Sequence, residues 1–364
     1  MSDIMISGYH GFKNSGDEAL LFAILNTLRE KRKNLDVTVL SNTPEETARV
    51  YGVKSINRYS FFRIRKEMKK SKLLLFGGGS LLQDVTSSKS LLYYLWIIFL
   101  AQNSGMKTML YANGIGPITK KINRQLASKI LNKVDVITLR DDKSDEELRS
   151  MGVTNPEIVI TADPAFTLDR DASLSGRYFT RMAGVPVGTK LCVVSVREWK
   201  KSVSNFEEEM AKLCDYMADT YNIYPLFVPM QYPLDIEISQ KIINKMKNPA
   251  YIITRELSVP EMFSVLSEIE FIIGMRLHSL IYATTLEIPA MALVYDPKIS
   301  AFMDSLNQTD WIEVDKFTFL SAKKVLDTIV NEKEEKRANL KVTNETLKKS
   351  ADKNGDYAIK LIDL

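Results

Sequence analysis

The residues best suited to chemistry lie in the run from Gly274 to Ser279, which reads Gly-Met-Arg-Leu-His-Ser. An imidazole can accept or donate a proton near neutral pH, and a guanidinium can hold a carboxylate or phosphate through two parallel hydrogen bonds. A lone histidine is more often a structural residue, but His278 is one of two in the chain and stands near Arg276 at a predicted strand-to-helix turn. We therefore predict that His278 takes part in a reaction.

Other cationic and polar side chains follow other predicted strands of the second half. Arg197, Gln231 and Lys298 each come shortly after an apolar run that we interpret as a buried strand. The carboxyl ends of parallel strands meet at one edge of a sheet, so these side chains should lie near Arg276. Such a group of cations close to a helix start predicts a site for a dianionic ligand.

The first half carries glycine-rich turns at residues 8–18, 77–80 and 113–117. Glycine allows tight turns and the close approach of backbone to a ligand, although packing of two backbone segments would explain each turn equally well. The glycine spacing in the first turn is not the dinucleotide-binding fingerprint. Several such turns at one sheet edge favour a binding face, on which we expect Asn14, Asp17, Gly78, Gly79, Asp84, Asn113 and Arg140.

These residues must be positioned by an α/β fold, because short apolar runs alternate with helical segments along most of the chain. Runs that are apolar throughout are typical of parallel strands covered on both faces. The sequence predicts two doubly wound, Rossmann-like domains facing a cleft, with an N-terminal domain over residues 1–167 and a C-terminal domain over 190–320. A crossing over 168–189 and a charged helical segment over 321–364 complete the expected organisation.

Composition excludes several classes of protein. The 364 residues are 45% hydrophobic and 26% charged, which is typical of a globular chain, and the net charge of +4 is too small to indicate a nucleic-acid partner. Two cysteines cannot build a disulfide scaffold or a four-ligand zinc site, and no basic, apolar leader is visible at the N-terminus.

The longest apolar run, residues 91–101, is too short to span a bilayer. We interpret it as a buried helix, with a helix dipping into a membrane interface as the alternative.

In these motifs the sequence resembles the polysaccharide pyruvyltransferases, especially the bacterial enzymes that pyruvylate cell-wall polymers for S-layer anchoring. The resemblance extends over about residues 3–310. The matching segments are 8–18, 40–44, 77–84, 113–117, 196–197, 228–231, 274–279 and 296–298. The Arg276-Leu277-His278 run is the most specific of them, because the glycine-rich loops alone would also fit glycosyltransferases.

The resemblance implies a GT-B-like fold and transfer of a pyruvyl group from phosphoenolpyruvate to a sugar, with release of phosphate. The implied acceptor is a β-linked N-acetylmannosamine on a lipid-diphosphate-linked precursor, whose 4 and 6 hydroxyls become bridged by a ketal. It further implies His278, Arg276 and Lys298 as catalytic residues and Arg197, Gly274, Ser279 and Gln231 as donor-binding residues. The glycine-rich face of the first half would then bind the acceptor. Neither a metal ion nor another cofactor is expected.

Two other functions fit part of the pattern. A GT-B glycosyltransferase that uses a nucleotide sugar would share the architecture, the glycine-rich loops and the cations. A carbohydrate-binding protein without turnover fits less well, because neutral sugars need no concentration of arginine, histidine and lysine. Measuring whether phosphate or a nucleotide diphosphate is released separates the first rival from pyruvyl transfer.

A basic segment at residues 58–72 holds seven Lys and Arg residues against one acid, Glu67, with Tyr59, Phe61 and Phe62 among them. A solvated helix face is the ordinary interpretation of such a run, but basic helices with aromatic residues also anchor proteins at membrane interfaces. An acceptor carried on a lipid would require work at a membrane. We therefore expect a cytoplasmic protein that binds the inner face of the cytoplasmic membrane weakly and in a salt-sensitive manner.

Overall fold

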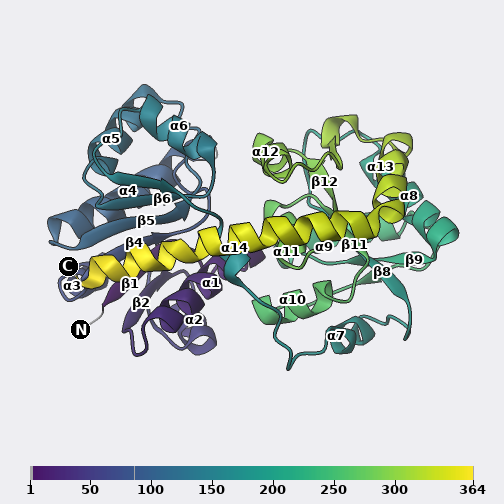
Figure 1. Cartoon of the computed structure of the whole chain (residues 1–364), viewed down its shortest axis with the longest axis horizontal. Helices are drawn as coiled ribbons and strands as arrows, with labels where there is room; N and C mark the ends of the chain where they lie inside the picture. The colour runs from purple at the N-terminus through teal and green to yellow at the C-terminus, as the bar shows by residue number, and fades with distance from the viewer. Residues whose placement is uncertain (1–2, 86, 364) are drawn as a thin grey trace. The chain divides into compact units, whose positions relative to one another are not determined.

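The computed structural model describes residues 3–85 and 87–363, and the chain divides into two compact units. Unit 1 contains residues 1–12, 17–167 and 347–364, and unit 2 contains residues 13–16 and 168–346. Each unit is a parallel β-sheet with helices on both faces, as Figure 1 shows. The predicted fold class, two α/β domains with parallel sheets, is confirmed.

The sheet of unit 1 has seven strands in the order β3-β2-β1-β4-β5-β6-β7. The strand order reverses between β1 and β4, which pair in parallel, and ligands of such sheets bind beyond the carboxyl ends of the strands at this reversal. The strands are β1 (Ile4–His10), β2 (Val37–Ser41), β3 (Lys54–Asn57), β4 (Leu73–Gly77), β5 (Lys107–Asn113), β6 (Val136–Leu139) and β7 (Glu157–Ile160).

Both faces of this sheet are apolar because successive strand residues alternate between two cores. Ile4 and Ile6 pack with one group of helices, whereas Met5 packs with the other. The first core includes α1 (Ser15–Lys31) and the end of α14 (Lys333–Asp363), and the second includes α3 (Phe61–Met68), α4 (Ser88–Asn103) and α5 (Lys121–Leu131). The unit also contains α2 (Pro44–Tyr51), α6 (Asp142–Ser150) and the 3-10 helix η1 (Pro164–Thr167).

The sheet of unit 2 has six strands in the order β10-β9-β8-β11-β12-β13, all paired in parallel. Gly274 of β11 lies between Ser195 of β8 and Ala292 of β12, so the residues that follow these strands leave the same edge. The strands are β8 (Lys190–Ser195), β9 (Ile223–Phe227), β10 (Tyr251–Ile252), β11 (Phe271–Gly274), β12 (Ala290–Val294) and β13 (Trp311–Glu313).

Helices α8 (Phe206–Tyr221), α9 (Leu234–Ile243) and α13 (Phe319–Asn331) share one core with the sheet of unit 2. The remaining elements of this unit are α7 (Gly176–Met182), α10 (Val259–Leu266), α11 (Leu277–Thr285), α12 (Pro297–Ser305) and η2 (Val314–Lys316). The expected crossing at 168–189 therefore holds a helix, α7. The expected segment 321–364 forms α13 and α14, and the residues of α14 from Leu347 onward belong to unit 1.

Candidate functional site

The turn from β11 into α11 places Arg276 and His278 at the carboxyl edge of the sheet of unit 2. Ser279 closes this turn, since its backbone N–H and its Oγ both donate to the carbonyl of Arg276, at 2.9 and 2.6 Å. A Cβ on Gly274 would lie 2.5 Å from Ser279 Oγ, so only glycine allows so tight a turn. Gly274 and Ser279, expected to bind a donor, therefore also shape the backbone that presents Arg276 and His278.

Arg276 is held by a carboxylate that the sequence analysis missed. Its Nε and Nη2 donate to the two carboxylate oxygens of Asp235, at 2.8 and 2.5 Å, and Nη2 also donates to Gln231 Oε1 at 3.1 Å. The side chains of Arg276 and Asp235 are 12% and 3% exposed. Asp235 also accepts the backbone N–H groups of Met230 and Gln231. The charge of Arg276 is thus already balanced, and within the described residues the two N–H donors of its Nη1 make no hydrogen bond.

His278 packs against residues 13–16, which lie near the N-terminus of the chain. Residues 13–16 belong to unit 2, where a Cβ on Gly16 would lie 2.5 Å from the Cγ of His278. Tyr282, one turn beyond His278 on α11, donates to the carbonyl of Ser15 at 2.7 Å. The backbone N–H of Ser15 donates to the carbonyl of Met230 at 2.9 Å. The imidazole therefore has a fixed backbone on one side.

Asn14 departs from the expected grouping. We predicted it on the glycine-rich face of the first half, but it forms an isolated antiparallel bridge with Gln231 of unit 2. Its Oδ1 accepts the backbone N–H of Gly16 at 3.1 Å. Asn14 and Gln231 thus lie together beside Arg276. Residues 13–16 belong to unit 2 although they are close to the N-terminus. Such a tertiary contact leaves no periodic signal in the sequence, so Asn14 was predicted in the wrong half.

Arg197 differs from Arg276 because no carboxylate in the described part of the chain balances its charge. Its guanidinium lies over the rings of Trp199 and Tyr295, 5.7 and 5.2 Å from their centroids, and Nη1 donates to the hydroxyl of Tyr295 at 3.3 Å. Its buried Nε has no hydrogen-bond partner in the described part of the chain, and no ion pair of Arg197 occurs there. Lys298 is more exposed and lies 3.6 Å from Asp296. Arg197 is therefore a half-buried guanidinium at this edge of the sheet that forms no ion pair with the described residues.

In unit 1, Asp17 and the glycine turn after β4 lie side by side. A Cβ on Gly79 would lie 3.4 Å from Asp17 Oδ1, and one on Gly78 would lie 2.8 Å from Leu20 Cδ1. Gly78 and Gly79 also have left-handed φ angles of 62° and 74°. Conformation and packing against α1 thus already require glycine at Gly78, while Gly79 presents backbone next to a half-buried carboxylate.

Asp84 and Asn113 are structural in this arrangement. The Asp84 carboxylate is 6% exposed and accepts from Thr119, Lys120 and Asn123 at 2.8 to 3.1 Å. Burial alone would raise the pKa of Asp84, but these hydrogen bonds outweigh it and hold the pKa well below its usual range. Asn113 is fully buried and donates to the carbonyl of Gly78 at 3.0 Å. Neither side chain offers a surface to a sugar, contrary to our expectation, because both hold the loops around them.

Arg140 joins two loops at the same edge of the sheet. Its Nη1 donates to Asp163 at 2.9 Å, and its Nη2 donates to the hydroxyl of Ser80 at 2.7 Å. The side chains of Arg140 and Asp163 are 8% and 4% exposed. A Cβ on Gly114 would lie 2.6 Å from Ser80 Oγ, so this glycine makes room for the network. Arg140 thus supports the glycine turn, with its charge balanced by Asp163.

A buried polar group near β1 was not singled out by the sequence analysis. Arg58 is 4% exposed, donates to the carbonyl of Gly8 and to the hydroxyl of Tyr94, and lies within 5.5 Å of the ring centroids of Phe12, Tyr59, Tyr93 and Tyr94. His10 is 1% exposed, and burial, with the Arg58 charge, lowers its pKa to about 3. His10 is therefore a neutral imidazole at physiological pH. An arginine in a basic run gives no sequence signal that it is buried among aromatic rings.

Within residues 3–85 and 87–363, no group of three His, Cys, Asp or Glu side chains is arranged to hold a metal ion. Within the same residues, no helix is long and apolar enough to cross a membrane. Cys192 and Cys214 are both buried as free thiols, and burial raises the pKa of each.

Solved structures with the same architecture define the class of fold. A UDP-GlcNAc 2-epimerase from Neisseria meningitidis, bound to UDP-GlcNAc, superimposes with a TM-score of 0.65 at 12% identity, covering 99% of both chains. The ADP-heptose lipopolysaccharide heptosyltransferase II of Escherichia coli superimposes with a TM-score of 0.53 at 10% identity, covering 91% of this chain and 99% of the other. The chain thus has a GT-B-like fold of two parallel-sheet domains.

The family follows from the sequence comparison. The polysaccharide pyruvyl transferase model matches residues 14–297, and the chain belongs to that family. A curated relative is the amylovoran biosynthesis protein AmsJ of Erwinia amylovora, 21% identical over 359 residues, with 83% of this chain and 86% of the relative covered. The protein is therefore an enzyme of pyruvyl transfer in polysaccharide biosynthesis.

Proposed function

We propose that the enzyme transfers the pyruvyl group of phosphoenolpyruvate to a sugar of a cell-wall polymer precursor, forming a ketal and releasing phosphate. The observation that carries this proposal is the group of side chains at the carboxyl edge of unit 2. Arg197, which no carboxylate of the described residues balances, follows β8, and Arg276 and His278 follow the adjacent strand β11. An anion-binding group next to an acid–base residue is what this donor requires.

The donor has two anionic ends, a carboxylate and a phosphate. A guanidinium matches either by paired hydrogen bonds, whereas an ammonium acts as a point charge. Arg197 provides an unbalanced cation, and Arg276 provides the two donors of Nη1 in an orientation fixed by Asp235. Lys298, which follows β12 on the other side of β11, adds a second, more exposed positive charge. We assign donor binding to these three residues together with Gln231.

The reaction needs proton transfer in both directions. One proton goes to the methylene carbon of the donor, which becomes the methyl group of the ketal. Two sugar hydroxyls lose their protons as their oxygens bond to the central carbon, whose bond to the phosphate oxygen breaks. Of the two protons released by the hydroxyls, one replaces the proton given to the methylene carbon, and the other leaves on the phosphate. His278 can serve one of these transfers, a contribution worth about 10²–10⁴ in rate.

We assign the acceptor to unit 1. The half-buried carboxylate of Asp17, which lies beside Gly79 of the glycine turn, would accept hydrogen bonds from sugar hydroxyls. The proposed acceptor is a β-linked N-acetylmannosamine on a lipid diphosphate, bridged at its 4 and 6 hydroxyls. This would serve cell-wall biogenesis and the anchoring of an S-layer at the inner face of the cytoplasmic membrane. Proteins of the same fold bind nucleotide sugars, so a nucleotide-sugar donor is the rival to exclude.

A binding titration separates the two donors before any acceptor is known. Calorimetry on the full chain should show saturable binding of phosphoenolpyruvate that inorganic phosphate weakens by competition. Arg197→Gln should weaken it at least about tenfold, because a charged hydrogen bond is lost. Arg181→Gln, at an exposed position of α7, is the matched control and should bind as the parent does. Saturable binding of UDP-GlcNAc with none of phosphoenolpyruvate would contradict the proposal.

A further inference from the structure

The outer surface formed by α3 and α4 in unit 1 combines exposed aromatic and basic side chains. On α3, Ile64 and Met68 are buried, whereas the ring of Phe62 is 84% exposed. Tyr59, just before the helix, is 65% exposed. Leaving a phenylalanine ring so exposed in water is unfavourable by about 1.5–3 kcal/mol relative to burying it, which favours a partner for this ring.

The aromatic area continues onto α4. Leu92, Trp96 and Phe99 recur at the i, i+4 and i+7 spacing of one helix face, and Leu92 and Phe99 are 41% and 44% exposed. Phe61 of α3 stacks on Trp96 with ring centroids 5.5 Å apart, which joins the two helices. The apolar run that we interpreted as a buried helix is therefore buried on one face and open on the other.

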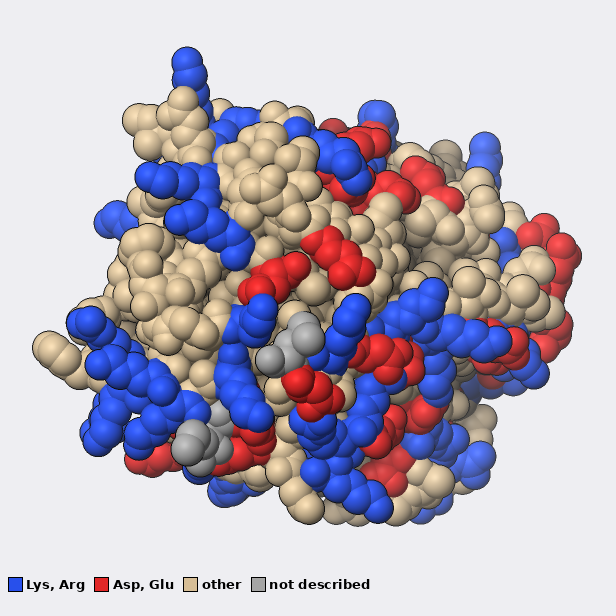
Figure 2. All heavy atoms as spheres, turned by 60° about the vertical axis from the view of Figure 1, so that its left-hand side comes forward, with Lys and Arg blue, Asp and Glu red and all other residues tan. Residues whose placement is uncertain are grey.

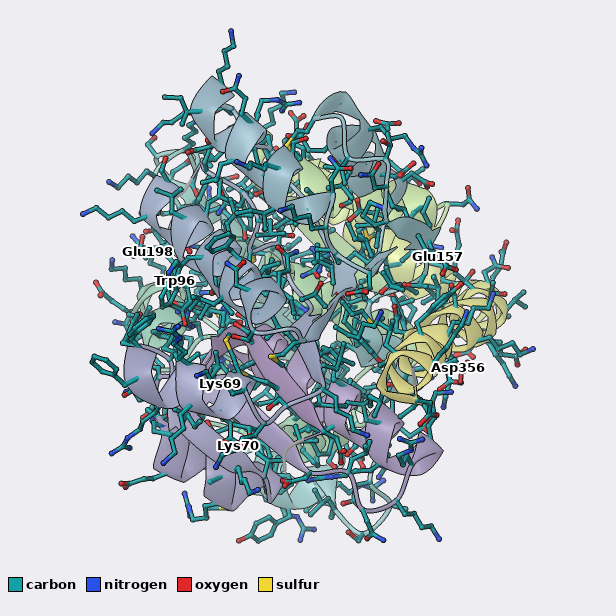
Figure 3. All side chains as sticks on the ribbon, turned by 90° about the vertical axis from the view of Figure 1, so that its left-hand side faces the viewer. Lys69, Lys70, Trp96, Glu157, Glu198 and Asp356 are labelled. Carbon is teal, nitrogen blue, oxygen red and sulfur yellow. The ribbon has the colours of Figure 1, made fainter. Side chains whose placement is uncertain are left out.

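Basic side chains are exposed on α3 itself and in the four residues after it. Those that are exposed and form no ion pair within the described residues are Arg63, Arg65, Lys66, Lys69, Lys70 and Lys72. Figure 3 shows Lys69, Lys70 and Trp96 on one side of unit 1, with Asp356 of α14 on the other side. Figure 2 shows Lys and Arg on this part of the molecule in groups beside wide neutral areas. Arg58, the first residue of the basic run, does not contribute because it is buried.

We propose that this surface, defined by Tyr59, Phe62, Leu92, Trp96, Phe99 and the six basic residues, docks on an anionic lipid bilayer. Aromatic rings insert at the level of the lipid headgroups, and each basic side chain near an anionic leaflet adds a favourable charge interaction. A nucleic acid would use the positive charges but would leave the apolar side chains of Leu92 and Phe99 without a partner. The bilayer accounts for both kinds of side chain.

The surface also lies close to the glycine-rich face of unit 1. Tyr59 contacts Tyr93 with ring centroids 5.9 Å apart, and both rings pack on Arg58, which donates to the carbonyl of Gly8. A lipid-linked sugar would therefore meet unit 1 where this unit meets the membrane. This consequence rests on the proposed function, whereas docking itself depends only on the α3 and α4 side chains.

Co-sedimentation of the full chain with vesicles tests the proposal without any substrate. At low salt the protein should bind vesicles of phosphatidylcholine with phosphatidylglycerol and should not bind phosphatidylcholine alone. Replacing Arg63, Arg65, Lys69 and Lys70 by glutamine should weaken binding at least about tenfold. Replacing Lys121, Lys129, Lys133 and Lys143, which are also exposed on unit 1, removes the same charge elsewhere and should leave binding almost unchanged.

Phe62→Ser tests whether insertion of the aromatic ring contributes to vesicle binding in addition to the basic charges. It should weaken vesicle binding and leave the thermal unfolding midpoint unchanged. Equal binding by the parent and the first glutamine variant would overturn the proposal, as would equal losses in the two glutamine variants. Preferential binding of a single-stranded oligonucleotide over anionic vesicles would also overturn it. Pyruvyl transfer to a short soluble acceptor should survive in every variant. If the parent protein itself showed no pyruvyl transfer, that result would count against the proposed function and not against docking.

Discussion

Arg276 donates to both carboxylate oxygens of Asp235, at 2.8 and 2.5 Å, and the two side chains are only 12% and 3% exposed, respectively. The pair fixes the plane of the guanidinium and cancels most of its charge. Arg276 therefore contributes oriented hydrogen-bond donors more than net charge, whereas Arg197, at the same edge of the sheet, forms no ion pair with the described residues.

Asp235→Asn should lower both stability and donor binding. Removing one partner of a buried ion pair leaves the other charge unbalanced, which costs about 3 kcal/mol in the free energy of unfolding. The KM for phosphoenolpyruvate should rise at the same time, because Arg276 loses its fixed orientation. Urea unfolding and steady-state kinetics measure the two effects.

Asp296→Asn is the matched control, since the pair of Asp296 with Lys298 is exposed and 3.6 Å long. Its loss should change the free energy of unfolding by less than about 1 kcal/mol. If the two variants proved equally stable, the pair of Arg276 with Asp235 would not have the structural role assigned here.

Gly16→Ala should impair turnover through the position of His278. The new Cβ would overlap the imidazole, 2.5 Å from Cγ, and a shift of about 1 Å in a reacting group can cost on the order of 10² in kcat. Gly105→Ala serves as the control for kcat, because in unit 1 the added atom meets no described atom within 4 Å. Its left-handed φ of 77° makes alanine there destabilising by about 1–2 kcal/mol, but kcat should stay unchanged. Unchanged kcat in Gly16→Ala would show that the packing of residues 13–16 on His278 does not matter for the reaction.

His10 should make the protein lose stability as the pH falls. The folded state holds the pKa of His10 at about 3, below the ordinary value of 6.5, so the unfolded chain takes up the proton first. The contribution of His10 to the free energy of unfolding is fully present above about pH 6.5. It is lost between pH 6.5 and pH 3, at up to about 1.4 kcal/mol per pH unit. His10→Gln cannot take up that proton.

Urea unfolding of the parent and of His10→Gln at pH 7 and pH 5 measures this effect. The parent should lose about 2 kcal/mol more than the variant between the two values, since other titrating groups are common to both. Identical pH dependence of the two proteins would mean that His10 is not held neutral in the folded state.

The sequence predicted most of the fold because its central strands are apolar throughout. Runs such as residues 73–76 and 271–273 are buried on both faces and leave a strong signal. The edge strands β3 and β13 were not predicted, because they are short and contain polar residues such as Lys54 and Glu313. Helix α14 was expected as helix, but nothing in its charge pattern indicates that it divides between two units.

The candidate site was predicted in part. The parallel strands bring the residues after β8, β9, β11 and β12 to one edge, as the spacing required. The partners that set the chemistry were missed. Asp235 looks like an ordinary acidic residue in the first turn of a helix, and the contact of Gly16 with His278 joins residues far apart in the chain. Such pairs depend on tertiary packing, which periodicity and motif spacing do not encode.

The most direct test is turnover by the purified full chain with phosphoenolpyruvate and a synthetic lipid-diphosphate disaccharide that ends in β-N-acetylmannosamine. Phosphate release and the mass of the glycan are followed together, with His278→Ala as the comparison. We predict one pyruvyl ketal formed for each phosphate released, and a rate about 10² or more lower in the variant. Release of a nucleotide diphosphate from a nucleotide sugar, with no pyruvyl group on the glycan, would contradict the account.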